Sequence, residues 1–439
     1  ITSSHHIKPS HRPTRFGSLT LSDHGFYQLM DIAIIGAGAA GLAAASVLQT
    51  DHQVTLFEQS DQIGGLWNAD TNYEKTPIYP SLRTNLPMQL MQYPNFEYAQ
   101  VFEPSEPAEH YNYPSYTRVL SYLDAFAKHY DLIQKIRFNT QVSKVAPAKQ
   151  GWRLELGNGQ VALADAVVIC NGHYSVPNLP TLEGIESFQG RLQHAKDYTR
   201  PDHFKGEQVL IWGGNASALD LVREISTTAS HVYWCGHADS MADIAADLPQ
   251  VSIKPDPIHV EGSRVTLKSG EQLNNVDALL LCTGYRYRFP FLDSKLINVD
   301  DNLVAPLYRQ ILSTKHPTLA FIGLPFLVIP FPLFLIQSQW LRAMLNEPNR
   351  LPKPFERLID SQNEIQDHLN SGKLSRHFHR LGPRQIQYLK QLIDEAGLDP
   401  MPDHFFALLQ SVQQLRQDYP THYRAMAINP SHPSHQPPA

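Results

Sequence analysis

The chain has 439 residues, a length that fits two or three globular units rather than one small domain. Acidic residues outnumber basic ones by 42 to 36, and the net charge of −6 gives no reason to expect a nucleic acid as partner. Hydrophobic residues make up 42% of the chain and charged residues only 18%. Such a composition can bury a large core, and it excludes the disordered and fibrous classes.

The chain contains 3 cysteines, Cys170, Cys235 and Cys282, and no two of them stand in CxxC spacing. The sequence therefore shows neither a disulfide framework nor a redox-active dithiol, and it favours a reducing, cytoplasmic compartment. The 21 histidines are scattered and do not join cysteines or carboxylates in the spacing of a metal site. We therefore expect no bound metal.

Residues 1–29 differ in character from the rest of the chain. They contain scattered histidines and arginines and lack the apolar core of a secretory signal. We interpret them as an extension added to the native chain, with a processed targeting leader as the alternative. From Met30 onward the sequence turns apolar and begins the first strand.

A glycine-rich loop between a strand and a helix is the first chemical signal. Asp31–Ile35 reads as an apolar strand, Gly36–Gly41 has GxGxxG spacing, and a helix is expected over Leu42–Leu48. In such a loop the glycines allow a tight turn, a close approach of pyrophosphate, and packing of the helix on the sheet. The helix N-terminus adds oriented N–H groups. The next strand, Val54–Phe57, ends in Glu58, whose carboxylate is expected to bind the ribose hydroxyls of an adenosine.

A second unit of this kind occurs later in the chain. Gln208–Trp212 reads as a strand, Gly213-Gly214 opens the loop, and a helix is expected over Leu219–Ser226. Asn215 adds a side chain where phosphate should approach, although Asn tolerates unusual backbone conformations. Ser217 can offset this by donating a hydroxyl hydrogen bond to phosphate. The pattern favours a second dinucleotide site, with an ordinary strand–helix turn as the alternative.

Two dinucleotide sites in one chain imply that electrons pass between two bound cofactors. Because the chain has no CxxC pair, the chemistry of a disulfide reductase is not open to it. We therefore expect O2 to accept the electrons.

One later segment, Leu319–Ile336, is uncharged and approaches the length of a membrane span. It contains Pro325, Pro330 and Pro332, each of which removes a backbone donor and disrupts a helix. Because a lipid-exposed helix could not easily satisfy the broken hydrogen bonds, we expect buried loops and short strands against a cofactor, and no integral membrane span.

Several motifs resemble those of the flavin-containing monooxygenases. Phe188-x-Gly190-x-x-x-His194-x-x-x-Tyr198 resembles the fingerprint of that family, and the related Baeyer–Villiger monooxygenases usually carry Trp in place of Tyr198. The other similar segments are Gly64–Trp67, Leu82–Pro87, Cys170–Pro177, Cys282–Tyr285, Phe289–Leu292, Phe321–Leu324 and Gln337–Trp340. The resemblance covers Met30 to about Leu345.

The resemblance implies an α/β fold with two Rossmann-like dinucleotide-binding domains, the smaller inserted into the larger. The FAD-binding domain would comprise residues 30–177 and 290–439, and the NAD(P)H-binding domain residues 178–289. Apolar residues at three- and four-residue spacing predict helices at Arg118–Tyr130, Arg384–Asp394 and His404–Asp418, which are expected to pack on the larger domain.

The resemblance also implies a reaction. NAD(P)H would reduce FAD, and the reduced flavin would capture O2 as a C4a-hydroperoxide. A soft nucleophile would then take up the distal oxygen, so that sulfides become sulfoxides and amines become N-oxides. The protein would mainly provide a dry apolar pocket and a few hydrogen-bond donors. The expected partners are a small sulfide or amine and O2, and the oligomeric state, a homodimer included, stays open.

Asn85 resembles the active-site asparagine of the family, and its amide is expected to act near the flavin C4a; an Asx turn is the alternative. By the same resemblance, the residues expected to bind FAD are Gly36, Gly38, Ala39, Ala40, Gly41, Glu58, Gln59, Gly65, Leu66, Trp67, Val142 and Gln337. Those expected to bind NADPH or NADH are Gly213, Gly214, Asn215, Ala216, Ser217 and His237. Core packing is the alternative role for Leu66 and Trp67, and a buried structural amide is the alternative for Gln337.

Two positions depart from the family pattern. After the strand His231–Trp234 many members carry an Arg that grips the 2′-phosphate of NADPH, whereas this chain reads Cys235-Gly236-His237-Ala238. We therefore expect weak discrimination between NADPH and NADH. Ala216 stands where some bacterial members have an aromatic residue over the pocket, which suggests a more open site and broader or bulkier substrates.

Three other functions fit parts of the pattern. A Baeyer–Villiger monooxygenase acting on ketones would use the same cofactors, although Tyr198 argues against it. A nonenzymatic FAD-binding redox sensor has only Asn215 and the missing Arg in its favour. An NAD(P)H oxidase that releases hydrogen peroxide would result if the open pocket admitted water.

Overall fold

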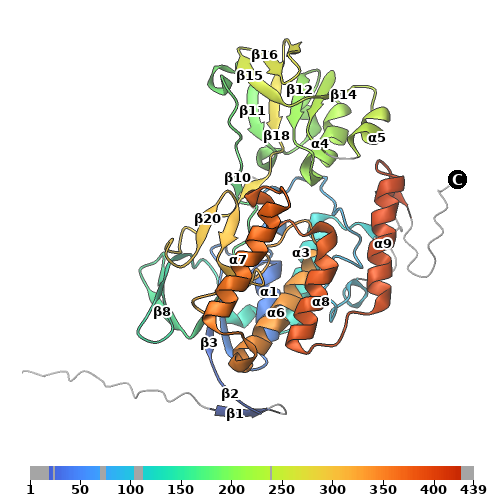
Figure 1. Ribbon diagram of the computed structural model, residues 1–439. Coiled ribbons are helices and arrows are strands. Elements are labelled where there is room, and N and C mark those ends of the chain that lie inside the picture. Colours follow the sequence, from blue (N-terminus) through green and yellow to red (C-terminus); the bar gives the residue numbers. More distant parts are fainter. Residues whose placement is uncertain (1–18, 23–24, 70–75, 103–111, 238–239, 427–439) are drawn as a thin grey trace, which may run out of the picture.

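The computed structural model describes residues 19–22, 25–69, 76–102, 112–237 and 240–426. These residues form two units, each built on a sheet with a parallel core, and two linkers join the units (Figure 1). This is the predicted α/β arrangement. Of the predicted extension, residues 1–18 and 23–24 lie outside the described residues, and β1 (Leu19–Ser22) and β2 (Gly25–Gln28) form a separate two-stranded sheet.

The larger unit contains a seven-stranded sheet in the order β22-β23-β24-β9-β3-β4-β5, in which β24, β9, β3, β4 and β5 run parallel. Central parallel strands are covered on both faces, which explains why β3 and β9 are almost entirely apolar and buried. The strands are β3 (Asp31–Ile35), β4 (Gln53–Phe57), β5 (Ile136–Arg137), β9 (Ala166–Ile169), β22 (Leu307–Tyr308), β23 (Leu312–Ser313) and β24 (Leu319–Phe321). Antiparallel strands flank it: β6 (Val142–Pro147), β7 (Trp152–Leu156), β8 (Val161–Ala164), β20 (Asn298–Asp300) and β21 (Leu303–Ala305).

Six helices of the larger unit are α1 (Ala39–Leu48), α3 (Tyr116–His129), α6 (Pro330–Asn346), α7 (Pro354–Asn370), α8 (Gln385–Ala396) and α9 (Asp403–Asp418). The predictions of α3, α8 and α9 are confirmed, whereas α7 was not predicted. α1 packs against α6 and α3, and α6 packs in turn against α8. Because it is covered on all sides, α1 is apolar around its whole circumference rather than on one face.

The uncharged segment Leu319–Ile336 differs in part from its prediction. It contains the short strand β24 and a buried loop, as expected, but residues from Pro330 onward are helical and begin α6. Pro330 and Pro332 both lie in the first helical turn, where backbone N–H groups have no acceptor within the helix, so proline is tolerated there. Within the described part of the chain, none of the helices has the length and apolarity needed to cross a membrane.

The smaller unit contains a five-stranded, fully parallel sheet in the order β11-β18-β12-β13-β14. Its strands are β11 (Arg191–His194), β12 (Gln208–Trp212), β13 (His231–Cys235), β14 (Val251–Lys254) and β18 (Ala278–Leu281). The helices α4 (Ala216–Ser226) and α5 (Met241–Ala246) and the antiparallel strands β15 (Pro257–Glu261), β16 (Arg264–Leu267) and β17 (Gln272–Leu273) complete it.

Two linkers connect the units and pair with each other. β10 (Val176–Pro177) leads into the smaller unit and β19 (Tyr285–Arg286) leads out of it, and the two form an antiparallel bridge between the units (Figure 1). All strands of the five-stranded sheet therefore lie between the two linkers, so the smaller unit is inserted into the larger one.

Candidate active site

The first glycine-rich loop lies at the carboxyl end of β3 and leads directly into α1. Gly36 has a φ of +104°, and its N–H donates to the Phe57 carbonyl of the neighbouring strand at 2.9 Å. A Cβ added to Gly41 would lie 1.9 Å from the Gly36 carbonyl oxygen. The turn and the packing of α1 therefore account for these two glycines without any ligand.

Gly38 is different, because the protein's own packing does not require a glycine there. Its backbone is extended (φ −79°, ψ −173°), and an added Cβ would meet no atom closer than the Gly65 Cα at 3.5 Å. Gly38 caps the N-terminus of α1, followed by Ala39 and Ala40, and this is where helical N–H groups lack intrahelical acceptors. The missing side chain leaves space in front of these donors, so the loop fits a pyrophosphate.

Glu58 directly follows β4 and is only 6% exposed. Its Oε2 accepts the N–H of Ala37 at 2.8 Å, and its Oε1 accepts the N–H (2.9 Å) and hydroxyl (2.8 Å) of Ser60. The carboxylate is therefore fixed beside the glycine-rich loop. Carboxylate oxygens have further lone pairs, so binding of ribose hydroxyls stays a prediction that this geometry permits.

The other predicted FAD-binding residues lie on separate segments of the larger unit. Gly65, Leu66 and Trp67 form a short 3-10 helix beside Gly38, and the side chains of Leu66 and Trp67 are half-buried against the core. Gln59 is exposed, and Val142 opens β6 with its side chain buried. For these residues, contact with FAD stays a prediction, and so does the alternative of core packing.

Gln337 lies on α6 and is completely buried. Its Oε1 accepts the N–H of Gly323 at 2.9 Å, and its Nε2 donates to the Tyr388 hydroxyl at 2.8 Å. These two bonds give Gln337 a structural role in joining α6 to α8. Contact with the flavin ring stays a prediction.

The second glycine-rich loop repeats this geometry at the carboxyl end of β12. Gly213 has a φ of +150°, and its N–H donates to the Cys235 carbonyl at 2.7 Å. An added Cβ would lie 2.2 Å from the Cys282 carbonyl oxygen. As in the first unit, the turn itself requires this glycine, and Gly214 continues the loop.

The helix after this loop begins at Ala216, earlier than the predicted Leu219. Asn215 is consequently the N-cap residue, and its side chain is exposed and makes no capping hydrogen bond. Asn215 therefore does not occupy the N–H groups at the start of α4. Ala216 and Ser217, the first two helical residues, stand beside these donors, which leaves the helix start open to phosphate.

His237 comes after β13, at the position that lacks the arginine of many family members. Its side chain is 85% exposed, and its Nε2 hydrogen-bonds with Oδ2 of Asp256 at 2.9 Å. The other oxygen of Asp256 accepts the indole N–H of Trp212 at 3.1 Å. The carboxylate of Asp256 thus joins His237 to Trp212 at this edge of the sheet.

Asn85 lies in a small pocket between the two units, with a free volume of about 30 Å³. No hydrogen bond joins its side chain to another described residue, so an Asx turn is not formed and the amide is available to a ligand. The residues that line the pocket are Asn85, Arg416, Pro420 and Tyr423 from the larger unit, and Ala216, Leu219, Asp220, Arg223, Ser240 and Ile244 from the smaller one. The residue expected beside the flavin and the first residue of α4 therefore share one cavity.

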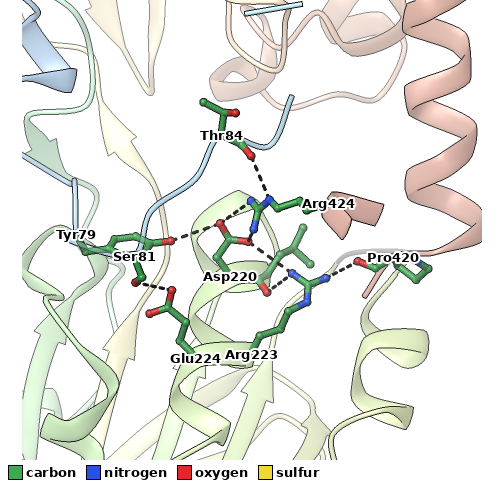
Figure 2. Close-up of polar contacts among 9 residues, drawn as sticks. Tyr79, Ser81, Thr84, Asp220, Arg223, Glu224, Pro420 and Arg424 are labelled. Atoms are coloured by element: carbon green, nitrogen blue, oxygen red, sulfur yellow. Dashed lines mark hydrogen bonds and ion pairs between the residues drawn. The ribbon is translucent and has the colours of Figure 1, made fainter. Parts of the chain in front are cut away.

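Polar contacts hold the two units together beside this pocket (Figure 2). Arg424, which lies beyond the end of α9, donates from both Nη atoms to the two carboxylate oxygens of Asp220 on α4, each at 2.9 Å. Its Nε donates to the carbonyl of Thr84 at 3.1 Å. One guanidinium group thus joins the neighbour of Asn85 to the helix of the second glycine-rich loop.

Further contacts extend this junction. Arg223 donates to the carbonyl of Pro420 at 2.5 Å, and the Ser81 hydroxyl donates to Glu224 at 2.7 Å (Figure 2). The hydroxyl of Tyr198 donates to the same Glu224 at 2.7 Å, and its ring packs edge-on against Tyr79 at 5.2 Å. The fingerprint residue Tyr198 therefore helps to couple the two units.

Sequence reasoning did not identify Arg424, Asp220 and Arg223. They belong to no recognisable motif, and Asp220 and Arg424 are 204 positions apart. The only signal in the sequence is the amphipathic pattern of α9, which predicts a packed helix but not which unit the residues after it contact.

Comparison with known proteins agrees with this architecture. Residues 30–243 and 239–413 match the flavin-binding monooxygenase-like family. The chain is 34% identical over 396 residues to the flavin-containing monooxygenase FMO GS-OX5 of Arabidopsis thaliana, a match that covers 84% of this chain and 86% of that protein. It is 37% identical over 356 residues to FMO GS-OX-like 6 of the same plant, covering 75% of both.

Solved structures give the same result. S-allyl-L-cysteine S-oxygenase from Allium sativum superposes with a TM-score of 0.84 at 28% identity, covering 93% of this chain and 97% of that one. Tmm from Pelagibacter sp. strain HTCC7211 superposes with a TM-score of 0.75, but at 22% identity it supports the fold alone. The match to the family spans most of the chain, and the chain therefore belongs to the flavin-containing monooxygenases, oxidoreductases that use FAD and NADPH.

Proposed function

We propose that this protein transfers one oxygen atom of O2 to a soft nucleophile, converting sulfides to sulfoxides and amines to N-oxides. The overall reaction consumes one substrate, O2, NADPH and a proton, and releases oxygenated product, water and NADP⁺. We assign FAD to residues 30–177 and 290–439, and the nicotinamide cofactor to residues 178–289. The observation that carries the proposal is the pocket that Asn85 shares with Ala216, because it brings the residue expected beside the flavin to the helix start of the second glycine-rich loop.

Bound FAD would supply the electron-transfer and oxygen-activating chemistry. The chain's own residues would bind and orient the reactants. Gly38 and the start of α1 leave room for the flavin pyrophosphate, and the start of α4 does the same for the nicotinamide cofactor. Asn85 would donate a hydrogen bond from its free amide, and apolar side chains such as Leu219 and Ile244 would keep water from the cavity.

Among soft nucleophiles, the comparisons favour sulfur. The structurally similar Allium enzyme is an S-oxygenase, and its 28% identity extends over nearly the whole chain. Family membership leaves the nonenzymatic redox-sensor interpretation without support. We also propose a cytoplasmic location, which is supported by the three buried, unpaired cysteines.

The test is an assay of the FAD-loaded enzyme with NADPH, oxygen-18-labelled O2 and either methyl p-tolyl sulfide or trimethylamine. We expect one labelled oxygen atom in each product and one NADPH consumed per product. Hydrogen peroxide as the main product would instead indicate an oxidase, and lactone formation from cyclohexanone at a higher kcat/KM would indicate a Baeyer–Villiger enzyme.

A variant pair connects the activity to the pocket. Asn85→Ala should keep bound FAD but lose most of the coupled oxygenation, because its amide is the free donor in the cavity. Asn95→Ala is the control, since Asn95 is exposed, donates to the Tyr130 hydroxyl at 2.8 Å and does not line the pocket. Equal activity in the two variants would contradict the role of Asn85.

A further inference from the structure

The pocket beside Asn85 carries an excess of positive charge. Arg424 binds both oxygens of Asp220 at 2.9 Å, and Nη1 of Arg223 lies 3.6 Å from the same carboxylate. Arg416 lines the pocket as well. Arg424 and Arg223 therefore both pair with this carboxylate, and the guanidinium of Arg416 adds a third positive charge at the pocket.

No other carboxylate of the described residues neutralises Arg416. Its guanidinium lies over the Tyr423 ring at 5.4 Å, and it forms no ion pair with a described residue. Glu224, one turn further along α4, accepts hydrogen bonds from the hydroxyls of Ser81 and Tyr198 and does not line the pocket. The charge of Arg416 is thus left for a ligand.

Arg223 is also incompletely satisfied. Its side chain is only 20% exposed, and its Nε is buried without a hydrogen-bond partner among the described residues. Burial lowers the pKa of this guanidinium, Asp220 and Tyr423 raise it in part, and the neighbouring Arg424 and Arg416 lower it further. An anion in the pocket would relieve this mutual repulsion.

We propose that the pocket binds the carboxylate of the substrate, so that the preferred substrate is a thioether acid, with its sulfur toward Asn85 and its carboxylate toward Arg416 and Arg223. This inference rests on the proposed oxygenation of sulfides. Guanidinium groups match a carboxylate in both geometry and charge. A volume of about 30 Å³ holds roughly two water molecules or one carboxylate group.

A phosphate of the nicotinamide cofactor is the other anion that could enter. Phosphates bind at the start of a helix, whereas Arg223 lies two turns along α4, roughly 10 Å from Ala216 at 1.5 Å per residue. Arg416 belongs to α9 of the larger unit. The arginines are therefore placed for a substrate group beside Asn85 rather than for the cofactor.

Three thioethers of equal length test the proposal: methylthiopropanoate, methylthiopropanol and the methylthiopropyl-trimethylammonium ion. They carry a negative, a zero and a positive charge at the end remote from sulfur, and the quaternary nitrogen cannot itself be oxygenated. With the FAD-loaded wild-type enzyme and NADPH, we expect kcat/KM for sulfoxide formation to be at least about tenfold higher for the acid than for the alcohol, and lowest for the cation.

Variants then attribute the preference to the pocket. Arg416→Gln should lower the acid-to-alcohol ratio of kcat/KM by about tenfold. Arg416→Lys should retain part of the preference, because it keeps the charge. Lys390→Gln is the matched control, since Lys390 also lies over an aromatic ring, that of Phe406 at 5.3 Å, but outside the pocket.

The outcomes separate the possible errors. Equal kcat/KM for the three thioethers in the wild type would contradict this inference alone, and this comparison needs no variant to fold. If Arg416→Gln lowered all three values equally, or raised the KM for NADPH at an unchanged substrate ratio, Arg416 would serve the structure or the cofactor and the inference would be wrong. If none of the three gave a sulfoxide, the proposed function would itself be wrong and this inference with it.

Discussion

Replacing Arg424 by Gln should loosen the junction between the two units. The guanidinium of Arg424 makes two hydrogen bonds to Asp220 of the smaller unit and one to the carbonyl of Thr84 in the larger unit. Glutamine is uncharged and cannot bind a carboxylate with two parallel N–H donors. The substitution therefore leaves Asp220 with Arg223, at 3.6 Å, as its remaining cationic neighbour.

The size of the effect depends on how far the pair is buried. Breaking a fully buried ion pair from one side costs about 3–5 kcal/mol, whereas exposed pairs contribute about 0–1 kcal/mol. The Arg424 and Asp220 side chains are 26% and 15% exposed, which places this pair between the two limits. Because Arg223 compensates in part, we expect a loss of about 2 kcal/mol in unfolding free energy. A double-mutant cycle with Asp220→Asn should give a coupling energy of about 1–2 kcal/mol.

Urea unfolding of the FAD-saturated enzyme, monitored by tryptophan fluorescence, would measure both values. The chain has two units, so a second probe such as circular dichroism is needed to establish that one transition is observed. Arg376→Gln is the control, because Arg376 and Asp301 are about half exposed and 3.8 Å apart, and we expect a change below about 0.5 kcal/mol. A coupling energy below about 0.5 kcal/mol between Arg424 and Asp220 would refute the reasoning.

Three further predictions concern the cofactor loops and the response to acid. Gly38→Ala should weaken FAD binding by at least about tenfold and change the melting temperature of the apoprotein little, because the added Cβ fits the fold but enters the space expected for phosphate. Unchanged affinity in a flavin titration would show that phosphate does not lie there. Burial lowers the pKa of His379 to about 3, and its Nε2 accepts the N–H of Val304 at 3.0 Å, so only the unfolded chain takes up this proton near pH 6.5. The unfolding free energy should therefore fall by up to about 1.4 kcal/mol per pH unit as the pH drops below about 6.5 toward 3. Urea midpoints of His379→Gln should depend less on pH than those of the wild type, and an equal pH dependence in the two proteins would contradict this prediction. His237 is hydrogen-bonded to Asp256, and the described residues of that loop include no arginine that could bind a 2′-phosphate. We therefore expect kcat/KM for NADPH to exceed that for NADH by less than about 100-fold, roughly 2.7 kcal/mol, and a larger ratio in steady-state assays would contradict this prediction.

Local sequence predicted the two glycine-rich loops well because each is a short-range structure. The strands Asp31–Ile35 and Gln208–Trp212 have the predicted bounds, since an apolar run followed by glycines defines a strand end within a few residues. Helix starts were less accurate: α1 begins at Ala39 and not at Leu42, and α4 begins at Ala216 and not at Leu219. Asn215 is the N-cap residue because the loop before it turns at Gly213, which packs against Cys235 and Cys282 from distant parts of the sequence.

The prediction for Leu319–Ile336 was partly wrong for a similar reason. Prolines disrupt the middle of a helix but not its first turn, and the sequence does not say where α6 begins. The start of α6 depends on long-range packing, because β24 is part of the sheet and α6 packs against α1.

Residue spacing over short segments was enough to predict the α/β fold, the two glycine-rich loops and the family. The neighbours of Asn85, by contrast, depend on long-range packing. Arg416, Arg223 and Arg424 come from α9, α4 and the segment after α9, and they lie close together because the inserted unit packs against the end of the chain. Contacts between residues 204 positions apart depend on how whole sheets and helices pack, and no local spacing encodes them.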